Sequence, residues 1–119
     1  MSNSLTVAFL DLENTTLKHL DLSGHAHVFM FVGARQHQIA FKSEYDHPMT
    51  VIKVQDLSGP ALKRPRNNLD FHLAYYLGLY DAFFPDHVTF EVISSDRGFL
   101  PLVAHIVASG RPCIQTGAQ

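Results

Sequence analysis

Three aspartates, Asp11, Asp70 and Asp96, are the residues of this sequence best placed to do chemistry. Asp11 ends an apolar run at residues 6–10, Asp96 follows a second run at residues 89–95, and Asp70 opens an amphipathic segment. In an open α/β sheet, ligands bind at the carboxyl ends of parallel strands. Carboxylates gathered at such an edge are typical of a site for a hard divalent cation, so we expect a metal centre there.

The elements that must position these aspartates alternate along the chain. Apolar runs bounded by turn residues predict strands, and amphipathic spacing predicts helices. This alternation predicts a three-layer, Rossmann-like α/β domain with a mainly parallel sheet of about five strands. The predicted strands cover residues 5–10, 28–32, 51–54, 90–93 and 111–116, and the predicted helices cover 14–21, 38–45, 67–80 (capped by Asn67 or Asn68) and 98–108.

The size and composition of the chain fit one globular domain, residues 1–119. Hydrophobic residues make up 46% and charged residues 17%, which favours a packed core and excludes a disordered chain. The net charge of −2 excludes a global basic field, so any polyanion must meet a local basic patch. The single cysteine, Cys113, excludes an intrachain disulfide, and we interpret it as a buried core residue.

The sequence also indicates a location. No apolar run approaches the ~20 residues that span a bilayer, and the first residues lack the basic-then-apolar pattern of a signal peptide. We therefore expect a reduced, cytoplasmic protein without a membrane partner.

The segments around the aspartates resemble the motifs of one superfamily. Residues 10–14, Leu-Asp-Leu-Glu-Asn, are similar to the first-strand motif of PIN-like and NYN nuclease domains. Residues 93–103 are similar to the "S-x-D-x-D-F…P-L" segment of the same superfamily. Residues 31–36 and 68–74 resemble the second-strand and central-helix segments of a bacterial PIN-like subgroup. The four strings occur in the family's order and span most of the chain.

The resemblance implies a metal-dependent nuclease that cuts RNA or single-stranded DNA and uses Mg²⁺ or Mn²⁺. In such a site a metal-bound water has a lowered pKa and attacks the phosphodiester, while the cation stabilises charge on the phosphate. Carried over position by position, the resemblance implies catalytic and metal-binding roles for Asp11, Asp70 and Asp96, and supporting pocket roles for Glu13, Asn14 and Ser95.

One position departs from the family pattern. Gly98 stands where the pattern has its last carboxylate, so a metal ligand is missing unless a neighbour such as Glu13 replaces it. The alternative function is therefore a non-catalytic nucleic-acid-binding protein that retains a partial acidic pocket. This alternative covers a dimeric DNA-binding protein and a dimeric regulatory protein.

Two further groups have both a functional and a plain structural interpretation. Lys63, Arg64 and Arg66 precede Asp70 and either contact the phosphates of a nucleic acid or form a solvated loop. Six aromatic residues in and after the helix at 67–80 exceed what one helix face can bury. We rank core packing first, a homodimer interface second and base stacking third. These aromatic residues are Phe71, Tyr75, Tyr76, Tyr80, Phe83 and Phe84.

Overall fold

The computed structural model describes residues 5–15, 22, 24–33, 48–54 and 67–117. The predicted helix at 38–45, most of the predicted helix at 14–21, and the basic loop with Lys63, Arg64 and Arg66 lie outside this part. The described strands are β1 (Thr6–Asp11), β2 (His27–Val32), β3 (Met49–Lys53), β4 (Thr89–Ile93) and β5 (Cys113–Thr116). The described helices are α1 (Asn68–Phe83) and α2 (Leu100–Ala108), with a short 3₁₀ turn, η2 (Arg97–Phe99), before α2.

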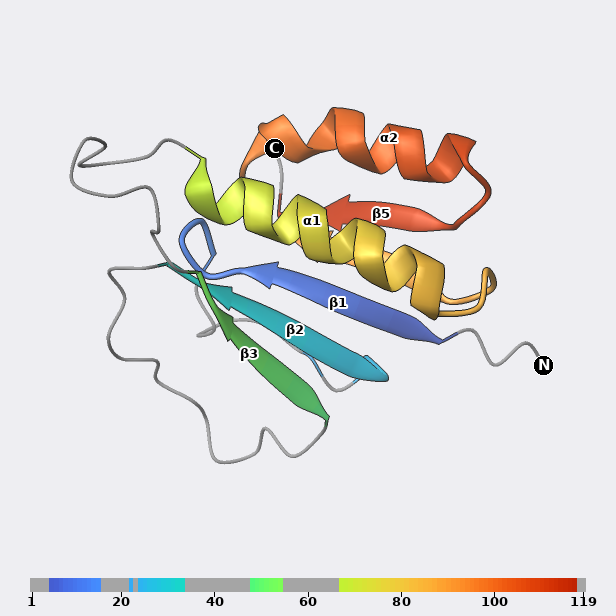
Figure 1. The fold of residues 1–119 in the computed structure, drawn as a ribbon, viewed down its shortest axis with the longest axis horizontal. Coiled ribbons are helices and arrows are strands. Elements are labelled where there is room, and N and C mark those ends of the chain that lie inside the picture. Colours follow the sequence, from blue (N-terminus) through green and yellow to red (C-terminus); the bar gives the residue numbers. More distant parts are fainter. Residues whose placement is uncertain (1–4, 16–21, 23, 34–47, 55–66, 118–119) are drawn as a thin grey trace.

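The five strands form one parallel sheet in the order β3-β2-β1-β4-β5 (Figure 1). Phe9 of β1 lies beside Phe29 of β2 on one side and Val92 of β4 on the other. The chain adds β2 and β3 on one side of β1, and then returns to add β4 and β5 on the other side. The strand order therefore reverses between β1 and β4, and this switch point is where open α/β sheets bind ligands.

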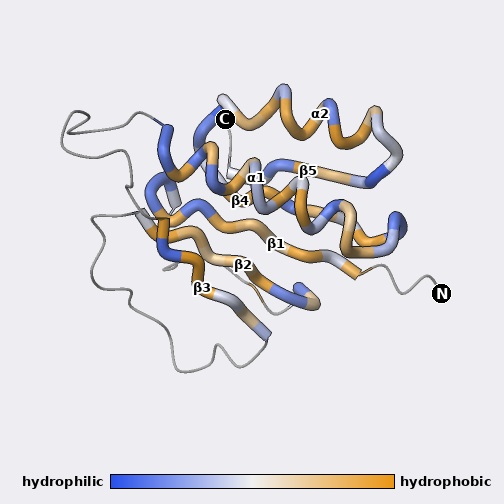
Figure 2. The backbone as a smooth tube through the Cα atoms, viewed as in Figure 1, coloured by the Kyte–Doolittle hydropathy of each residue, from blue (hydrophilic) through white to orange (hydrophobic). Residues whose placement is uncertain are grey.

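The central strands are apolar on both faces. In β1 and in β2, five of the six residues are buried, and Figure 2 shows both strands as mainly hydrophobic segments. Such runs suit strands covered on two sides, whereas the edge strand β3 carries exposed Val51 and Lys53. The parallel five-stranded sheet confirms the predicted α/β class.

Helices α1 and α2 pack on the same face of the sheet. Leu69, Leu73 and Leu77 recur every fourth residue along α1 and are fully buried, each contributing roughly 1.5–3 kcal/mol of apolar burial. Beside them, α2 contributes Val103 and Ile106 to the same core. The sheet residues of this core include Val7, Phe9, Phe29, Phe31, Phe90 and Val92.

The opposite face of the sheet is buried as well. Alternate residues of the strands point to this side, because successive side chains of a strand face opposite ways. Burial on both faces is what a three-layer α/β domain requires. This second core contains Ala8, Leu10, Leu12, Leu22, Val28, Met30, Val32 and Ile93.

The aromatic residues of α1 divide between two environments. Tyr76 and Tyr80 pack against the core, as does Phe84 just after the helix. For these three, core packing is confirmed. For Phe71, Tyr75 and Phe83 it was wrong, because the spacing of four residues places them on the outer face of α1, where they are exposed together with Leu79.

The segment expected to be one helix at 98–108 has two parts. Residues 97–99 form η2 because the Asp96 side chain accepts a hydrogen bond from the Gly98 amide and starts a tighter turn. The α-helix then begins at Leu100 and has Pro101 in its first turn, where the missing N–H costs nothing. The expected start was therefore wrong by two residues.

The buried residue Arg111 joins the end of α1 to β5. Its guanidinium donates to the carboxylate of Asp81 and to four backbone oxygens, and it stacks 4.2 Å from the centre of the Phe90 ring. All of these acceptors lie between residues 81 and 88. A planar group with five donors is suited to this task, and it fixes the turn between α1 and β4.

Cys113 is buried in β5, as predicted. Burial raises the pKa of its thiol to about 11, so the sulfur stays protonated at neutral pH. None of the helices in the described ranges is long and apolar enough to cross a membrane.

Candidate functional site

Asp11 is the last residue of β1, and it is fully buried at 0% exposure. Its Oδ1 accepts a hydrogen bond from the Glu13 amide at 3.0 Å. Its Oδ2 accepts from Asn14 Nδ2 at 2.9 Å and from the Ser94 hydroxyl at 2.8 Å. Hydrogen bonds of this kind offset the cost of burying a charge. They also hold the carboxylate in one orientation.

Ser94 connects the ends of β1 and β4. Its hydroxyl donates to Asp11 and accepts a hydrogen bond from the Asp96 amide at 3.0 Å. Ser95 was expected in the pocket and Ser94 was not. The observed pairing of Leu10 with Ile93, continued by one residue, places Ser94 beside Asp11. Ser95 is exposed, and its hydroxyl donates to the backbone oxygen of Asn14 at 2.8 Å.

Asp96 follows β4 and is held at both its side chain and its backbone. Its Oδ1 accepts from the Gly98 amide at 2.8 Å, and its backbone oxygen accepts from Gln115 Nε2 at 2.8 Å. The same Nε2 donates to the backbone oxygen of Ser94 at 3.0 Å, so Gln115 of β5 fixes the turn that carries both residues. The sequence offered no signal for Gln115 beyond its place in the last strand.

Asp70 lies in the first turn of α1, which begins at the carboxyl edge of the sheet (Figure 1). The pKa of its carboxyl is raised to about 7, and burial is the largest cause. A hydrogen bond to the Asp96 side chain and the negative charges of Asp96, Asp11 and Glu13 contribute the rest of this shift. Three aspartates distant in sequence therefore lie close enough to interact electrostatically.

Glu13 is the fourth carboxylate of this group, and burial followed by the charge of Asp11 raises its pKa. Its side chain lies against Gly33, where a Cβ would be only 2.1 Å from Glu13 Oε2. Alternation along the strand was the reason to expect Glu13 to point away from Asp11. That reasoning does not hold beyond Asp11, because β1 has ended and residues 12–14 form a turn.

The donor chemistry of these four residues fits a hard divalent cation, since all offer carboxylate oxygens and their mutual repulsion favours a positive charge. Their positions do not form a ready coordination sphere. Among the residues that the structure describes, no three His, Cys, Asp or Glu side chains are grouped closely enough to hold a metal ion. Hydrogen bonds already engage both oxygens of Asp11 and one of Asp96.

Comparison of the chain with curated proteins gave no significant match. Comparison with solved structures gave none either. A family model described as the PIN domain matches residues 5–116, and it thus includes all five strands and every carboxylate of the site. The match and the switch-point geometry agree with the resemblance of the motif strings. The chain therefore belongs to the PIN domain family.

Proposed function

We propose that this chain is a metal-dependent nuclease that cleaves RNA or single-stranded DNA with Mg²⁺ or Mn²⁺. The observation that carries the proposal is the convergence of Asp11, Glu13, Asp70 and Asp96 at the switch point of the sheet. Burial and the neighbouring carboxylates raise the pKa of Asp70 to about 7, and this supports the proposal, because a carboxyl among other carboxylates lies in a site with excess negative charge. Membership of the PIN domain family, a nuclease superfamily, points the same way.

In this proposal the side chains of Asp11, Asp70 and Asp96 move closer together around the cation as it binds, and Glu13 supplies the carboxylate that is missing at position 98. The bound cation would activate a water and stabilise charge on the phosphate. Ser94 and Asn14 keep the buried Asp11 side chain in place by hydrogen bonds. Ser95 holds the Asn14 backbone from the other side of the turn. Lys63, Arg64 and Arg66 would contact the backbone phosphates of the strand.

Cleavage of labelled single strands in Mn²⁺ tests this function. Wild-type protein should cut, and Asp70→Asn should not, because the amide removes a negative charge from the cation site. Asp86→Asn is the matched control, since Asp86 is 97% exposed and the substitution changes the net charge equally. Equal cleavage by wild type and Asp70→Asn would refute the assignment.

Gly98 favours a second candidate, a nucleic-acid-binding protein without catalysis. It predicts binding that weakens steeply with salt, through counterion release, and no cleavage with any divalent cation. This candidate would be supported over the nuclease if the protein binds single strands and leaves no cleavage product after prolonged incubation in Mn²⁺.

We also propose that the protein is a homodimer in a reduced, cytoplasmic setting. The exposed stripe of Tyr75, Leu79 and Phe83 on α1 supports self-association, because aromatic residues are enriched in interface cores. The buried, protonated thiol of Cys113 suits a reducing compartment. Sedimentation as a monomer at high concentration would refute the dimer.

A further inference from the structure

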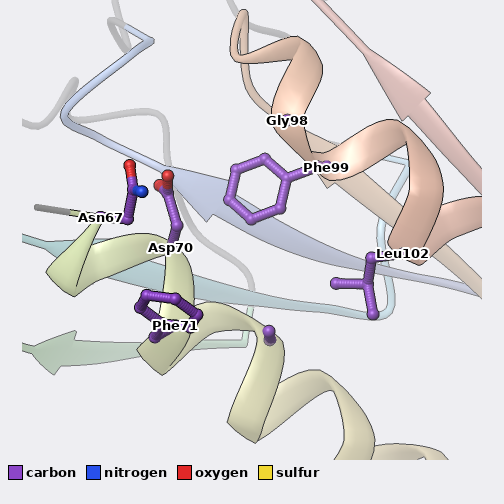
Figure 3. A pocket seen from close by; sticks show the side chains of 7 residues that line it. Asn67, Asp70, Phe71, Gly98, Phe99 and Leu102 are labelled. Atoms are coloured by element: carbon purple, nitrogen blue, oxygen red, sulfur yellow. The ribbon is translucent and has the colours of Figure 1, made fainter.

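An open pocket of about 280 Å³ lies beside the acidic residues, between the first half of α1 and the start of α2. Asp70 belongs to its lining and therefore joins the pocket to the carboxylate group. Figure 3 shows Asn67 and Asp70 side by side, with the ring of Phe99 and then Leu102 along the facing segment. Phe71 and Ala74 of α1 complete the apolar part of the lining.

The pocket combines apolar walls with a small polar end. Such a lining is typical of sites that bury the flat faces of a ligand and fix its orientation through a few polar contacts. Phe71 stands at the pocket with 70% of its surface exposed, so its ring is available to a ligand. Nucleobases match this chemistry, because their faces stack on aromatic rings and their edges form hydrogen bonds.

Asn67 supplies the polar end. An asparagine before a helix usually caps it with its side chain, but Asn67 makes no such bond. Its backbone has a φ of 59°, a left-handed conformation that is uncommon outside glycine and asparagine. Asn67 lines the pocket and its amide lies beside the Asp70 side chain (Figure 3), where it can donate to and accept from the edge of a base.

Gly98 leaves the wall of the pocket neutral. It lines the pocket at the position where the family pattern has a carboxylate. A Cβ at this position would lie 3.0 Å from Asp96 Oδ1, so even a small side chain would crowd the acidic group. The glycine thus leaves space for an uncharged group next to Asp70.

We propose that this pocket binds one unpaired base of a single strand whose adjacent phosphate lies at the acidic residues. The inference rests on the proposed function, and it narrows the substrate to strands with unstacked, unpaired bases. A base held in a duplex cannot enter without first leaving its stack.

Binding of short fluorescent single strands in Ca²⁺ tests the pocket, with a strand of the same length that lacks all bases as the comparison. Wild type should bind the intact strand about tenfold more tightly, the order expected for one base stacked on an aromatic ring. A duplex of the same sequence should compete weakly. Phe71→Ala removes the stacking face and Ala74→Leu fills the pocket, so both should lose the preference for bases.

Phe83→Ala is the matched control, because Phe83 is 77% exposed on the same helix but does not line the pocket. Phe83→Ala should keep the preference for the intact strand over the base-free strand. Equal affinity of wild type for intact and base-free strands would overturn the proposal. An equal loss in Phe71→Ala and Phe83→Ala would also overturn it, because the outer stripe of α1 would then be responsible.

The cleavage assay separates this inference from the proposed function. Cleavage that Asp70→Asn abolishes, together with equal binding of intact and base-free strands, would retain the nuclease and overturn the pocket. A preference for bases that Ala74→Leu removes, in a protein that never cleaves, would support the pocket and refute the nuclease.

Discussion

The carboxylate of Glu13 occupies the space where a side chain of Gly33 would begin. A Cβ built on Gly33 would lie 2.1 Å from Glu13 Oε2 and 2.8 Å from its carboxyl carbon. The two residues follow the neighbouring strands β1 and β2 at the carboxyl edge of the sheet. The missing side chain therefore allows Glu13 to stay close enough to Asp11 and Asp70 to raise their electrostatic repulsion.

Gly33→Ala should displace Glu13 from the acidic group. The obstructing atoms belong to the end of a flexible side chain, so we expect a stability cost below about 1 kcal/mol. The stabilisation by Mn²⁺, measured as the rise in melting temperature, should become smaller, because a ligand stabilises only through its affinity for the folded state. In a Glu13→Ala background, Gly33→Ala should not reduce the stabilisation by Mn²⁺ any further. If it reduces this stabilisation as much as in the wild type, Gly33 acts independently of Glu13.

Asp70→Asn should flatten the dependence of stability on pH in metal-free buffer. The pKa of this carboxyl is raised from 3.8 to about 7 in the fold, so the folded state binds more protons than the unfolded state between those values. The free energy of unfolding therefore falls as the pH rises through this window and is lowest above about pH 7. The side chain is partly exposed, so we discount the effect to about 1 kcal/mol, or roughly 3–5 °C at pH 8.

Thermal melts of wild type and Asp70→Asn from pH 4 to pH 8 measure this change. The variant should melt higher than wild type at pH 8, and the two should converge near pH 4. Asp86→Asn, at a site that is 97% exposed, should keep the wild-type slope. Parallel pH profiles for wild type and Asp70→Asn would contradict the predicted repulsion.

Ser94→Ala should be more damaging than Ser95→Ala. The buried hydroxyl of Ser94 makes two hydrogen bonds, one to the Asp11 carboxylate and one from the Asp96 amide. Its loss leaves buried partners unpaired and should cost about 2–3 kcal/mol in urea unfolding. Ser95 is exposed and makes one bond to a backbone oxygen, so its substitution should cost below about 1 kcal/mol. Equal costs for the two variants would refute the role given to Ser94.

Arg111→Lys should destabilise the domain by about 3 kcal/mol, although the charge is kept. An ammonium group has three donors and no planar fork, so it cannot reach all the acceptors between residues 81 and 88. Buried backbone oxygens would then lack partners. Urea unfolding measures the loss, and the exposed Arg97→Lys is the control. Similar midpoints for the two variants would contradict this role of Arg111.

The sheet was predictable because its strands are short, apolar and bounded by turn residues. Runs that are apolar on both faces, such as residues 6–10, have few alternatives to a buried parallel strand. The position of Asp11 and Asp96 followed from the same rule, since each comes at or just after the carboxyl end of a strand that adjoins the switch point. The position of Asp70 followed from its place in the first turn of α1.

The contacts within the site were not predictable from spacing alone. Ser94 and Ser95 are equally polar, and only the register between β1 and β4 decides which of them faces Asp11. The division of the aromatic residues likewise depends on which side of α1 meets the sheet. Asn67 or Asn68 was expected to cap the helix. Asn67 occupies the N-cap position, yet its backbone is left-handed and its side chain makes no capping bond.

Gly98→Asp should separate the two candidate functions, because it returns a carboxylate to the position where the family pattern has one. A new Cβ would lie 3.0 Å from Asp96 Oδ1, so Asp96 must shift by a few tenths of an ångström, while the backbone of Gly98 needs no left-handed conformation. In a nuclease that binds its cation weakly, the added ligand should increase both the Mn²⁺-dependent rise in melting temperature and the cleavage rate.

Gly98→Asn is the matched control for this last substitution, since it has nearly the same size without the charge. It should narrow the pocket as much as Gly98→Asp does, and both variants should therefore bind intact strands with less preference for bases. Only Gly98→Asp should respond more strongly to Mn²⁺. If the two variants respond equally to the metal, the position does not belong to a cation site, and Gly98 serves the pocket alone.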